Sequence, residues 1–425
     1  MIGTLDPKHR EVTIVGAGIA GMLAAYALLK RGYSVHLLEE KERAGGLIRT
    51  TRTEYGIAES AAHSIIATAA VRDLCRDLGV ELIEPRRESR AKYVVRDGHL
   101  RRFPLTIGET FSTLRHAAFA RASNGATENL ESWARRHLGG AALDYLLTPF
   151  VRGIYGVQPF ELGVTTAFPF LDIPSGKTLL TTVLRRHRNH SARKGGDRSK
   201  KQRVAPRFGM GDLVGRLERR LEERLGSGFR KQEKINELPD SPNVIIATPA
   251  YAAAELLRSA APELAAKLMT VRYTPIVSVT TFVDRKAFDH PIHGTGVLMP
   301  ACENTKSLGI LFNSSSFAER VTAESRFASF TVMMGGASQP QWLKASDEEI
   351  WRAIKLELSS LLGIREPHAV VIHRWPAALP QYSTELPQVW LHARATWCST
   401  PGHLLFGNYT GQISLRGMIE SAMAM

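Results

Sequence analysis

The chain has 425 residues, enough for two or three domains with a sizeable core, and its 44% hydrophobic and 23% charged residues are an ordinary globular balance. This composition excludes a disordered chain, a coiled coil and a collagen-like repeat. Three distant cysteines, Cys75, Cys302 and Cys398, provide no disulfide framework and no CxxC metal site, which favours a reducing compartment. No apolar run reaches the roughly 18 residues that span a membrane, and the N-terminus lacks a signal peptide's apolar segment. The net charge of +14 leaves nucleic acid, a membrane surface or an acidic substrate as partner classes.

The chain opens on a strand–turn–helix–strand pattern. Residues 11–15 read as a buried parallel strand, and residues 33–38 read as a second strand after an Ala/Leu-rich helix. The intervening GxGxxG turn allows a tight bend, a close backbone approach to pyrophosphate and close helix packing, while the helix start offers free N–H groups. The cofactor-binding residues predicted in this turn are Gly16, Gly18, Ile19, Ala20 and Gly21.

An acidic pair follows the second strand. Glu39 comes 18 residues after Gly21, where a carboxylate accepts hydrogen bonds from ribose hydroxyls. Glu40 stands next to it, so either residue could be this acid. Glu39 is preferred because it directly follows the apolar run.

The next segment, Arg43-Ala-Gly-Gly46-Leu47, resembles an extension found in flavoproteins of the amine oxidase and protoporphyrinogen oxidase superfamily, and it favours FAD over NAD. Paired glycines let the backbone pass close to a cofactor, and an arginine can neutralise phosphate. The alternative for Arg43 is a surface ion pair with Glu40 or Glu42.

Beyond this motif the resemblance narrows to the protoporphyrinogen oxidase family and extends along nearly the whole chain. The segments that carry it, in the family's order, are 131–162, 207–213, 273–282, 294–300, 308–317, 331–336, 375–382 and 404–421.

The resemblance implies further cofactor contacts. Residues beside the flavin would be Ala61, Ala62, His63 and Ser64, together with Ile413, Ser414 and Leu415 at a helix start that faces it. Ile235 would clamp adenine through a backbone group. Two departures from the family pattern, Ala61-Ala62 in place of Gly-Pro and Gln412 in place of a glycine, alter the backbone near the flavin.

The resemblance also implies substrate contacts. Arg90 would meet a propionate, and Gly296 and Leu298 would sandwich a tetrapyrrole. A solvent-exposed arginine beside Glu88 is the alternative for Arg90, and ordinary core packing is the alternative for Leu298.

The implied activity is FAD-dependent oxidation of protoporphyrinogen to protoporphyrin in haem biosynthesis, with oxygen as acceptor. The cofactor would take hydride from the macrocycle, so we assign no catalytic acid or base and no metal site. The alternatives are a coproporphyrinogen oxidase of the same fold, an amine or carotenoid oxidase, and a catalytically weak relative that binds tetrapyrrole or a protein, which the two departures motivate.

The expected fold class is α/β (α+β overall). A Rossmann-like FAD domain would use residues 1–80, 204–255 and 395–425, and a substrate domain with an antiparallel sheet would use 81–104 and 256–394. A helical segment, 105–203, would end in a basic loop.

That loop, residues 185–203, holds nine Lys or Arg and one acid, a net +8 that leaves +6 elsewhere. It is expected to be exposed and mobile. Its alternatives are a solvated linker, contact with an anionic membrane or protein, and, least favoured, a nucleic-acid arm. The remaining expectations are a cytoplasmic protein, peripheral on the inner face of the membrane, and a ferrochelatase or a second copy as protein partner.

Overall fold

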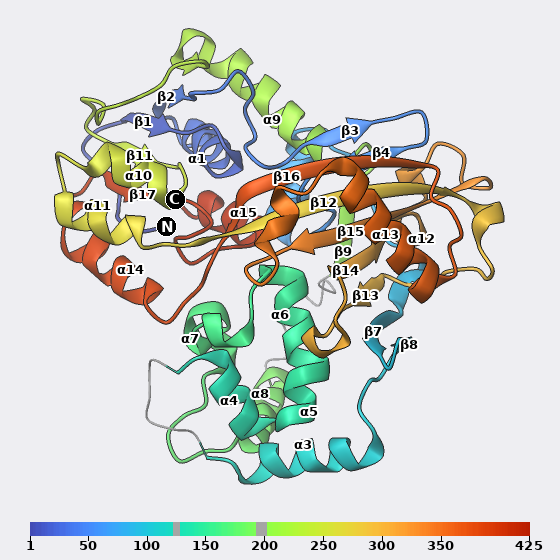
Figure 1. The fold of residues 1–425 in the computed structure, drawn as a ribbon. Helices are drawn as coiled ribbons and strands as arrows, with labels where there is room; N and C mark the ends of the chain where they lie inside the picture. The colour runs from blue at the N-terminus through green and yellow to red at the C-terminus, as the bar shows by residue number, and fades with distance from the viewer. Residues whose placement is uncertain (122–127, 193–201) are drawn as a thin grey trace. The chain divides into compact units, whose positions relative to one another are not determined.

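The computed structural model describes residues 1–121, 128–192 and 202–425 (Figure 1). The chain divides into two compact units, each assembled from separate pieces. The first unit comprises Met1–Pro85, Lys201–Tyr273 and Leu386–Met425, and the second comprises Arg86–Lys200 and Thr274–Glu385. Residues 105–192, expected to form a helical segment of their own, therefore belong to the same unit as the larger sheet.

A five-stranded parallel sheet organises the first unit, in the order β10-β2-β1-β11-β17. Its strands are β1 (Glu11–Val15), β2 (Ser34–Leu38), β10 (Phe229–Arg230), β11 (Val244–Ile246) and β17 (His403–Leu405). Strands buried on both faces require nearly continuous apolar runs, which is why β1 and β2 could be predicted from the sequence.

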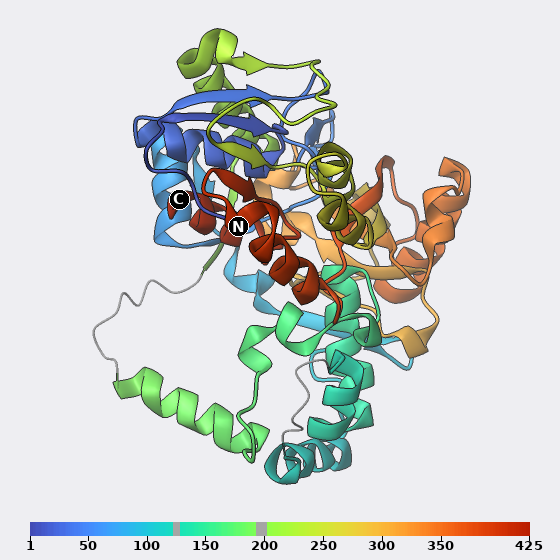
Figure 2. The same ribbon diagram turned by 90° about the vertical axis from the view of Figure 1, so that its left-hand side faces the viewer.

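Helices of the first unit share one apolar core with this sheet. They are α1 (Ile19–Lys30), α2 (Ala69–Asp77), α9 (Met210–Leu225) and α15 (Leu415–Met423), with α10 (Ala250–Leu257), α11 (Pro262–Met269) and α14 (Leu386–Ala395) also in the unit. Short strands complete it: β3 (Thr50–Arg52) pairs with β4 (Ile57–Glu59), and β9 (Gln202–Pro206) pairs with β5 (Ile65–Ala67) and β6 (Leu82–Ile83). The two ends of the chain lie near each other in this unit (Figure 2).

A seven-stranded sheet organises the second unit, in the order β16-β12-β15-β14-β13-β7-β8. Its strands are β7 (Lys92–Arg96), β8 (His99–Arg101), β12 (Tyr273–Asp284), β13 (Gly296–Leu298), β14 (Ser307–Phe312), β15 (Phe327–Gly335) and β16 (Ala369–Pro380). The predicted sheet was antiparallel, but β13 and β7 run parallel. Two strands that far apart in the chain need no hairpin between them, so either direction can pair.

The two faces of this sheet differ. On one face Val277, Val279 and Val332 pack with helix α13 (Asp347–Leu362), whose N-terminus carries a capping box. Because side chains alternate along a strand, the opposite face carries Thr280, Leu298 and the residues in register with them. This second face is the one on which the predicted substrate residue Leu298 lies.

Helices between residues 107 and 192 belong to this unit (Figure 1). They are α3 (Ile107–Phe119), α4 (Leu130–His137), α5 (Gly140–Ala142), a π-helical turn η2 (Leu143–Leu147), α6 (Thr148–Tyr155), α7 (Val164–Ala167) and α8 (Leu179–Ala192). A further short helix, α12, spans Asn313–Ser316.

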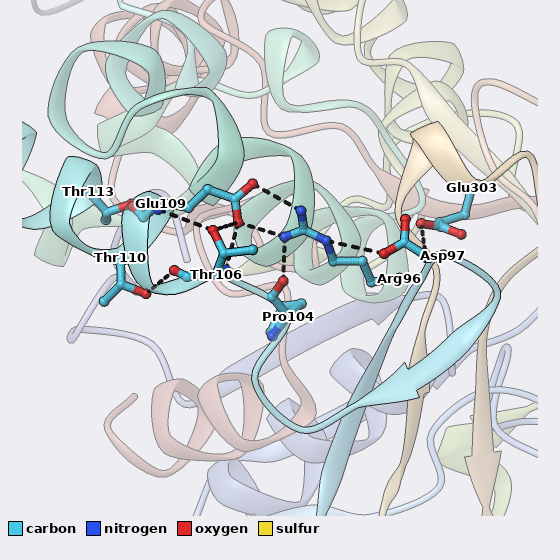
Figure 3. Close-up of polar contacts among 8 residues, drawn as sticks. All are labelled: Arg96, Asp97, Pro104, Thr106, Glu109, Thr110, Thr113 and Glu303. Atoms are coloured by element: carbon cyan, nitrogen blue, oxygen red, sulfur yellow. Dashed lines mark hydrogen bonds and ion pairs between the residues drawn. The ribbon is translucent and has the colours of Figure 1, made fainter.

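Helix α3 is tied to the β7–β8 hairpin by a cluster of polar contacts (Figure 3). The Arg96 guanidinium donates to both carboxylate oxygens of Glu109, at 2.7 and 3.0 Å, and to the carbonyl of Pro104. Glu109 is also the N3 residue of a capping box with Thr106. The arginine and its helix-capping carboxylate together fix the start of α3.

The expectation of a loop at 185–203 is wrong at both ends. Residues 185–192 continue helix α8, and residues 202 and 203 begin strand β9, while 193–201 lie outside the described residues. The apolar Leu179–Leu184 segment leads into the basic run without a helix-breaking residue, so the helix extends into it. No helix in the described part of the chain is long and apolar enough to cross a membrane.

Candidate functional site

The glycine-rich turn has the geometry that a pyrophosphate site needs. Gly16 adopts a φ of +99° and donates from its N–H to the Leu38 carbonyl at 2.7 Å. A Cβ on Gly21 would lie 1.9 Å from the Gly16 carbonyl oxygen, so only glycine lets the helix pack this closely. A Cβ on Gly18, by contrast, would meet no atom within 4 Å. The turn is therefore packed tightly against the protein at Gly21 and leaves free space at Gly18.

The start of helix α1 faces this opening. Gly18 is its N-cap and supplies no side-chain hydrogen bond to the first N–H groups, which include those of Ile19 and Ala20. The second glycine-rich segment lies alongside: the Gly45 N–H donates to the Ala17 carbonyl at 2.8 Å, and a Cβ on Gly46 would come 3.4 Å from the Gly18 Cα. Uncapped N–H groups at a helix start bind anions such as phosphate.

Of the two candidate acids, Glu39 is the one turned toward this site. Its Oε2 accepts from the Ala17 N–H at 2.7 Å and its Oε1 from the Lys41 N–H at 3.0 Å. Glu40 is exposed. The geometry thus favours Glu39, the residue preferred from the sequence.

Arg43 folds back onto its own loop. Its guanidinium donates to the carbonyls of Ala44 and Ile48, both at 3.0 Å, and to that of Gly46. No ion pair joins it to Glu40 or Glu42 within the residues that the structure describes. The arginine shapes the 44–48 loop, on which Leu47 is also held through its carbonyl by the Ser60 hydroxyl at 2.7 Å.

Glu59 is a buried anchor that the sequence reasoning did not single out. Only 2% of it is exposed, and its carboxylate accepts from the Met210 N–H at 2.8 Å and the Thr50 hydroxyl at 2.6 Å. It thereby caps helix α9 and fixes the β3–β4 hairpin, from which the half-buried segment Ala61, Ala62, His63 and Ser64 departs. Its sequence signal was an acid at the end of an apolar strand.

The chain brings Ile235 beside the acid. The Glu39 N–H donates to the Arg230 carbonyl and the Glu233 N–H to the Glu39 carbonyl, both at 2.9 Å. Ile235 follows two residues later and is half-buried. The chain between β10 and β11, all of it described, contains no strand.

The last predicted segment begins helix α15. Ser414 is its N-cap, with its hydroxyl accepting from the Gly417 N–H at 3.1 Å, and Ile413 and Leu415 are half-buried on either side. The Gln412 side chain covers the first turn, since a Cβ on Gly417 would lie 2.1 Å from its Oε1. The residue that departs from the family pattern thus folds back onto its own helix.

The predicted substrate residues meet at one corner of the second unit. Gly296 pairs with Lys92 in the parallel β13–β7 register, and the Thr295 N–H donates to the Ala91 carbonyl at 2.7 Å, next to Arg90. A Cβ on Gly296 would lie 2.4 Å from the Ile310 carbonyl oxygen, so the packing of the strands requires glycine here. Arg90 is exposed at the end of a 3₁₀ turn, before the strand begins.

Lys92 is the cation that the sequence reasoning missed. The register places it opposite Gly296 and places Val94 opposite Leu298, so Lys92 and Leu298 share one face. Its side chain is exposed and makes no hydrogen bond or ion pair with any residue in the described ranges. Its sequence signal was a cation directly before Tyr93 at the start of a strand.

The comparisons with known proteins agree with this organisation. Residues 19–424 match the model of the flavin containing amine oxidoreductase family. Protoporphyrinogen oxidase 2, chloroplastic/mitochondrial, of Arabidopsis thaliana is 27% identical over 472 residues, which cover 97% of this chain and 92% of the relative.

Two solved structures share the fold. A provisionally named protoporphyrinogen oxidase from Exiguobacterium sp. 255-15 has a TM-score of 0.76 at 20% identity, covering 99% of this chain and 98% of its own. Cyclohexylamine oxidase from Brevibacterium oxydans IH-35A has a TM-score of 0.69 at 16% identity, covering 97% of each chain. The resemblance seen in the sequence is confirmed, and the chain belongs to the flavin containing amine oxidoreductase family.

Proposed function

We propose that this oxidoreductase uses FAD to oxidise protoporphyrinogen IX to protoporphyrin IX, with oxygen as the acceptor. The observation that carries the proposal is the corner of the second unit where Leu298 shares a face with Lys92, close to Arg90. The Lys92 ammonium is unpaired among the residues that the structure describes. A large apolar macrocycle with two propionates needs such an apolar surface flanked by cations. The Arabidopsis relative named protoporphyrinogen oxidase, similar over 97% of this chain, supports it.

The residues of the first unit fit the cofactor. The open space at Gly18 and the uncapped start of α1 suit a pyrophosphate, and the Glu39 carboxylate suits a ribose. Ile235 would contact adenine through its backbone, and segments 61–64 and 413–415 would lie beside the flavin ring. When bound, FAD supplies the hydride acceptor.

The protein's own residues would bind and orient the macrocycle. Lys92 and Arg90 would each hold a propionate, and Leu298 would pack against the ring and exclude water from it. Hydride departure from a meso carbon requires no protein nucleophile. We therefore assign the side chains binding and positioning roles only.

Two measurements test this function. The cofactor released from purified protein should have the mass of FAD. Anaerobic mixing with protoporphyrinogen IX should bleach the flavin through the first two-electron step, and admitting oxygen should then reoxidise the flavin, complete the remaining steps and produce fluorescent porphyrin. Faster bleaching by coproporphyrinogen III would move the assignment to that substrate. Bleaching by neither porphyrinogen in FAD-loaded protein would overturn it.

We further propose that helix α3 lies on an anionic membrane surface. None of its residues is buried; Ile107 and Phe119 are 79% and 78% exposed, and Phe111 and Leu114 are exposed on the same helix. Arg101, Arg102 and Arg115, also exposed, add positive charge near this apolar surface. Apolar side chains next to arginines are typical of interfacial helices.

Vesicle sedimentation tests this surface. Binding to phosphatidylglycerol vesicles should exceed binding to phosphatidylcholine vesicles and should fall at least about tenfold in the double variant Phe111→Ser, Phe119→Ser. Met269→Ser, at an exposed apolar residue of α11, is the matched control. Equal sedimentation of all three proteins would contradict the proposal.

A further inference from the structure

Helix α6 carries a buried arginine. Only 3% of Arg152 is exposed, and its Nη1 donates to the Met299 carbonyl at 2.9 Å, while its buried Nε has no hydrogen-bond partner in the described part of the chain. Met299 directly follows strand β13, which ends at Leu298. The guanidinium therefore reaches the strand that carries the proposed substrate contacts.

The neighbouring glycine brings α6 against the same strand. A Cβ on Gly153 would lie 2.5 Å from the Leu298 Cδ2, so the leucine side chain rests on the helix backbone itself. Gly156 continues this close approach, since a Cβ there would come 2.8 Å from the Thr274 side chain. Helix α6 thus holds Leu298 by its side chain and Met299 by its carbonyl.

Stability alone does not explain an arginine at this place. Burial lowers the pKa of Arg152, and the Glu357 carboxylate offsets this only in part. No carboxylate lies within ion-pair distance of Arg152 among the described residues. A buried cation without a paired carboxylate costs free energy that an apolar side chain of similar size would not.

The segment after Met299 is also held from the hairpin side. Glu303 accepts from the N–H of Asp97 at 2.9 Å (Figure 3) and from the N–H of Gly98 at 3.2 Å. Those contacts are exposed, whereas the Arg152 contact is buried and adjacent to Leu298. Of the two contacts that hold this segment, the one from the Arg152 guanidinium is therefore closer to Leu298 and better shielded from solvent.

We propose that Arg152 is a positioning residue, which fixes the Met299 carbonyl and thereby sets the Leu298 side chain against the macrocycle; this rests on the proposed function. The bond that it makes is a charge-assisted hydrogen bond in a water-poor place, where such bonds are strong. Losing it would loosen the end of β13 without removing any group from the flavin site.

The test compares Arg152→Met and Arg152→Lys with wild type. KM for protoporphyrinogen should rise about tenfold in Arg152→Met, with kcat and flavin content within about twofold of wild type. Amide hydrogen exchange in peptides covering 296–308 should become faster in the free protein. Added guanidinium at low concentration should lower the KM of Arg152→Met.

Arg135→Met is the matched control, because Arg135 is an exposed arginine of the same unit paired with Glu131. It should change neither KM nor exchange. Unchanged KM and unchanged hydrogen exchange in a folded Arg152 variant would overturn the positioning role. If Arg152→Met does not fold, the same measurements are made on Arg152→Lys. If the wild-type protein oxidises no porphyrinogen, the proposed function is overturned instead. The hydrogen-exchange experiment would still show whether Arg152 holds the segment that contains Met299.

Discussion

The turn around Gly16 to Gly21 and the corner around Lys92 and Leu298 are built in different ways. In the turn, backbone atoms form the site: a side chain at Gly16 or Gly21 would crowd the chain, and Gly18 leaves the space in front of the helix start open. At the corner, the register of two strands brings together residues some two hundred positions apart. A site made of backbone tolerates almost no change in sequence, whereas a site made by register can exchange one cation for another.

The largest effects are expected from substitutions in the turn itself. Gly21→Ala should lower FAD affinity by about 100-fold or more, since its Cβ would collide with the Gly16 carbonyl. Gly18→Ala should keep the melting temperature within about 2 °C and lower FAD affinity about tenfold, because its backbone at φ −61° suits alanine and only the ligand's place is filled. Titration of apoprotein with FAD measures both.

Gly215→Ala is the control for these two glycines. It lies inside helix α9, a Cβ there would meet nothing within 4 Å, and the change should stabilise the protein by up to about 1 kcal/mol. Equal FAD affinity in the Gly18, Gly21 and Gly215 variants would place the cofactor elsewhere.

At the corner, the two cations can be separated. Lys92→Met should raise KM for porphyrinogen about tenfold and Arg90→Met about threefold, because Lys92 shares the face of Leu298 while Arg90 precedes the strand. Steady-state kinetics on both variants shows which substitution raises KM more. The control is Lys344→Met, at an exposed lysine of the same unit, which should leave KM unchanged. A larger increase in KM for Arg90→Met than for Lys92→Met would favour Arg90 as the main propionate contact, as the sequence predicted.

The acid of the first unit offers a smaller test. Glu39→Gln should weaken FAD binding about fivefold, since the amide oxygen still accepts from the Ala17 N–H but the negative charge near the ribose is gone. Glu40→Gln should bind FAD as wild type does. Fluorescence titration with FAD compares them, and equal losses would mean that the acids share the role.

The smallest effect concerns the start of α3. The Arg96 guanidinium, with the Thr106 contacts, lowers the pKa of Glu109 from 4.5 to about 2. The stability that this shift provides is therefore present above about pH 4.5 and is lost as the pH falls toward 2. Because the pair is only half-buried and solvent screens it in part, Glu109→Gln should cost less than about 1 kcal/mol at pH 7. Urea unfolding at both pH values measures it, and a pH-independent difference would contradict the assignment.

The sequence predicted the nucleotide turn closely and the substrate corner only in part. Gly16, Gly18, Gly21 and Glu39 lie together because a local strand–turn–helix unit places them, and local units leave a motif. Arg90 was assigned from the family resemblance, and Lys92 was not considered, because its place opposite Gly296 appears only in the register of the folded sheet. The 185–192 stretch was expected to be a loop from its charge, yet charge does not prevent a helix when no proline or glycine interrupts it.

By itself the sequence determined the α/β class, the parallel strand pattern at the start and the membership in a flavin-dependent family. These follow from short-range patterns of glycine, apolar and acidic residues. Only the tertiary structure decided that Lys92 shares a face with Leu298, that Glu59 caps α9 and that Arg152 holds Met299. Each of these contacts joins residues far apart in the chain, and their meeting depends on strand register and close helix packing, for which a linear sequence carries no local signal.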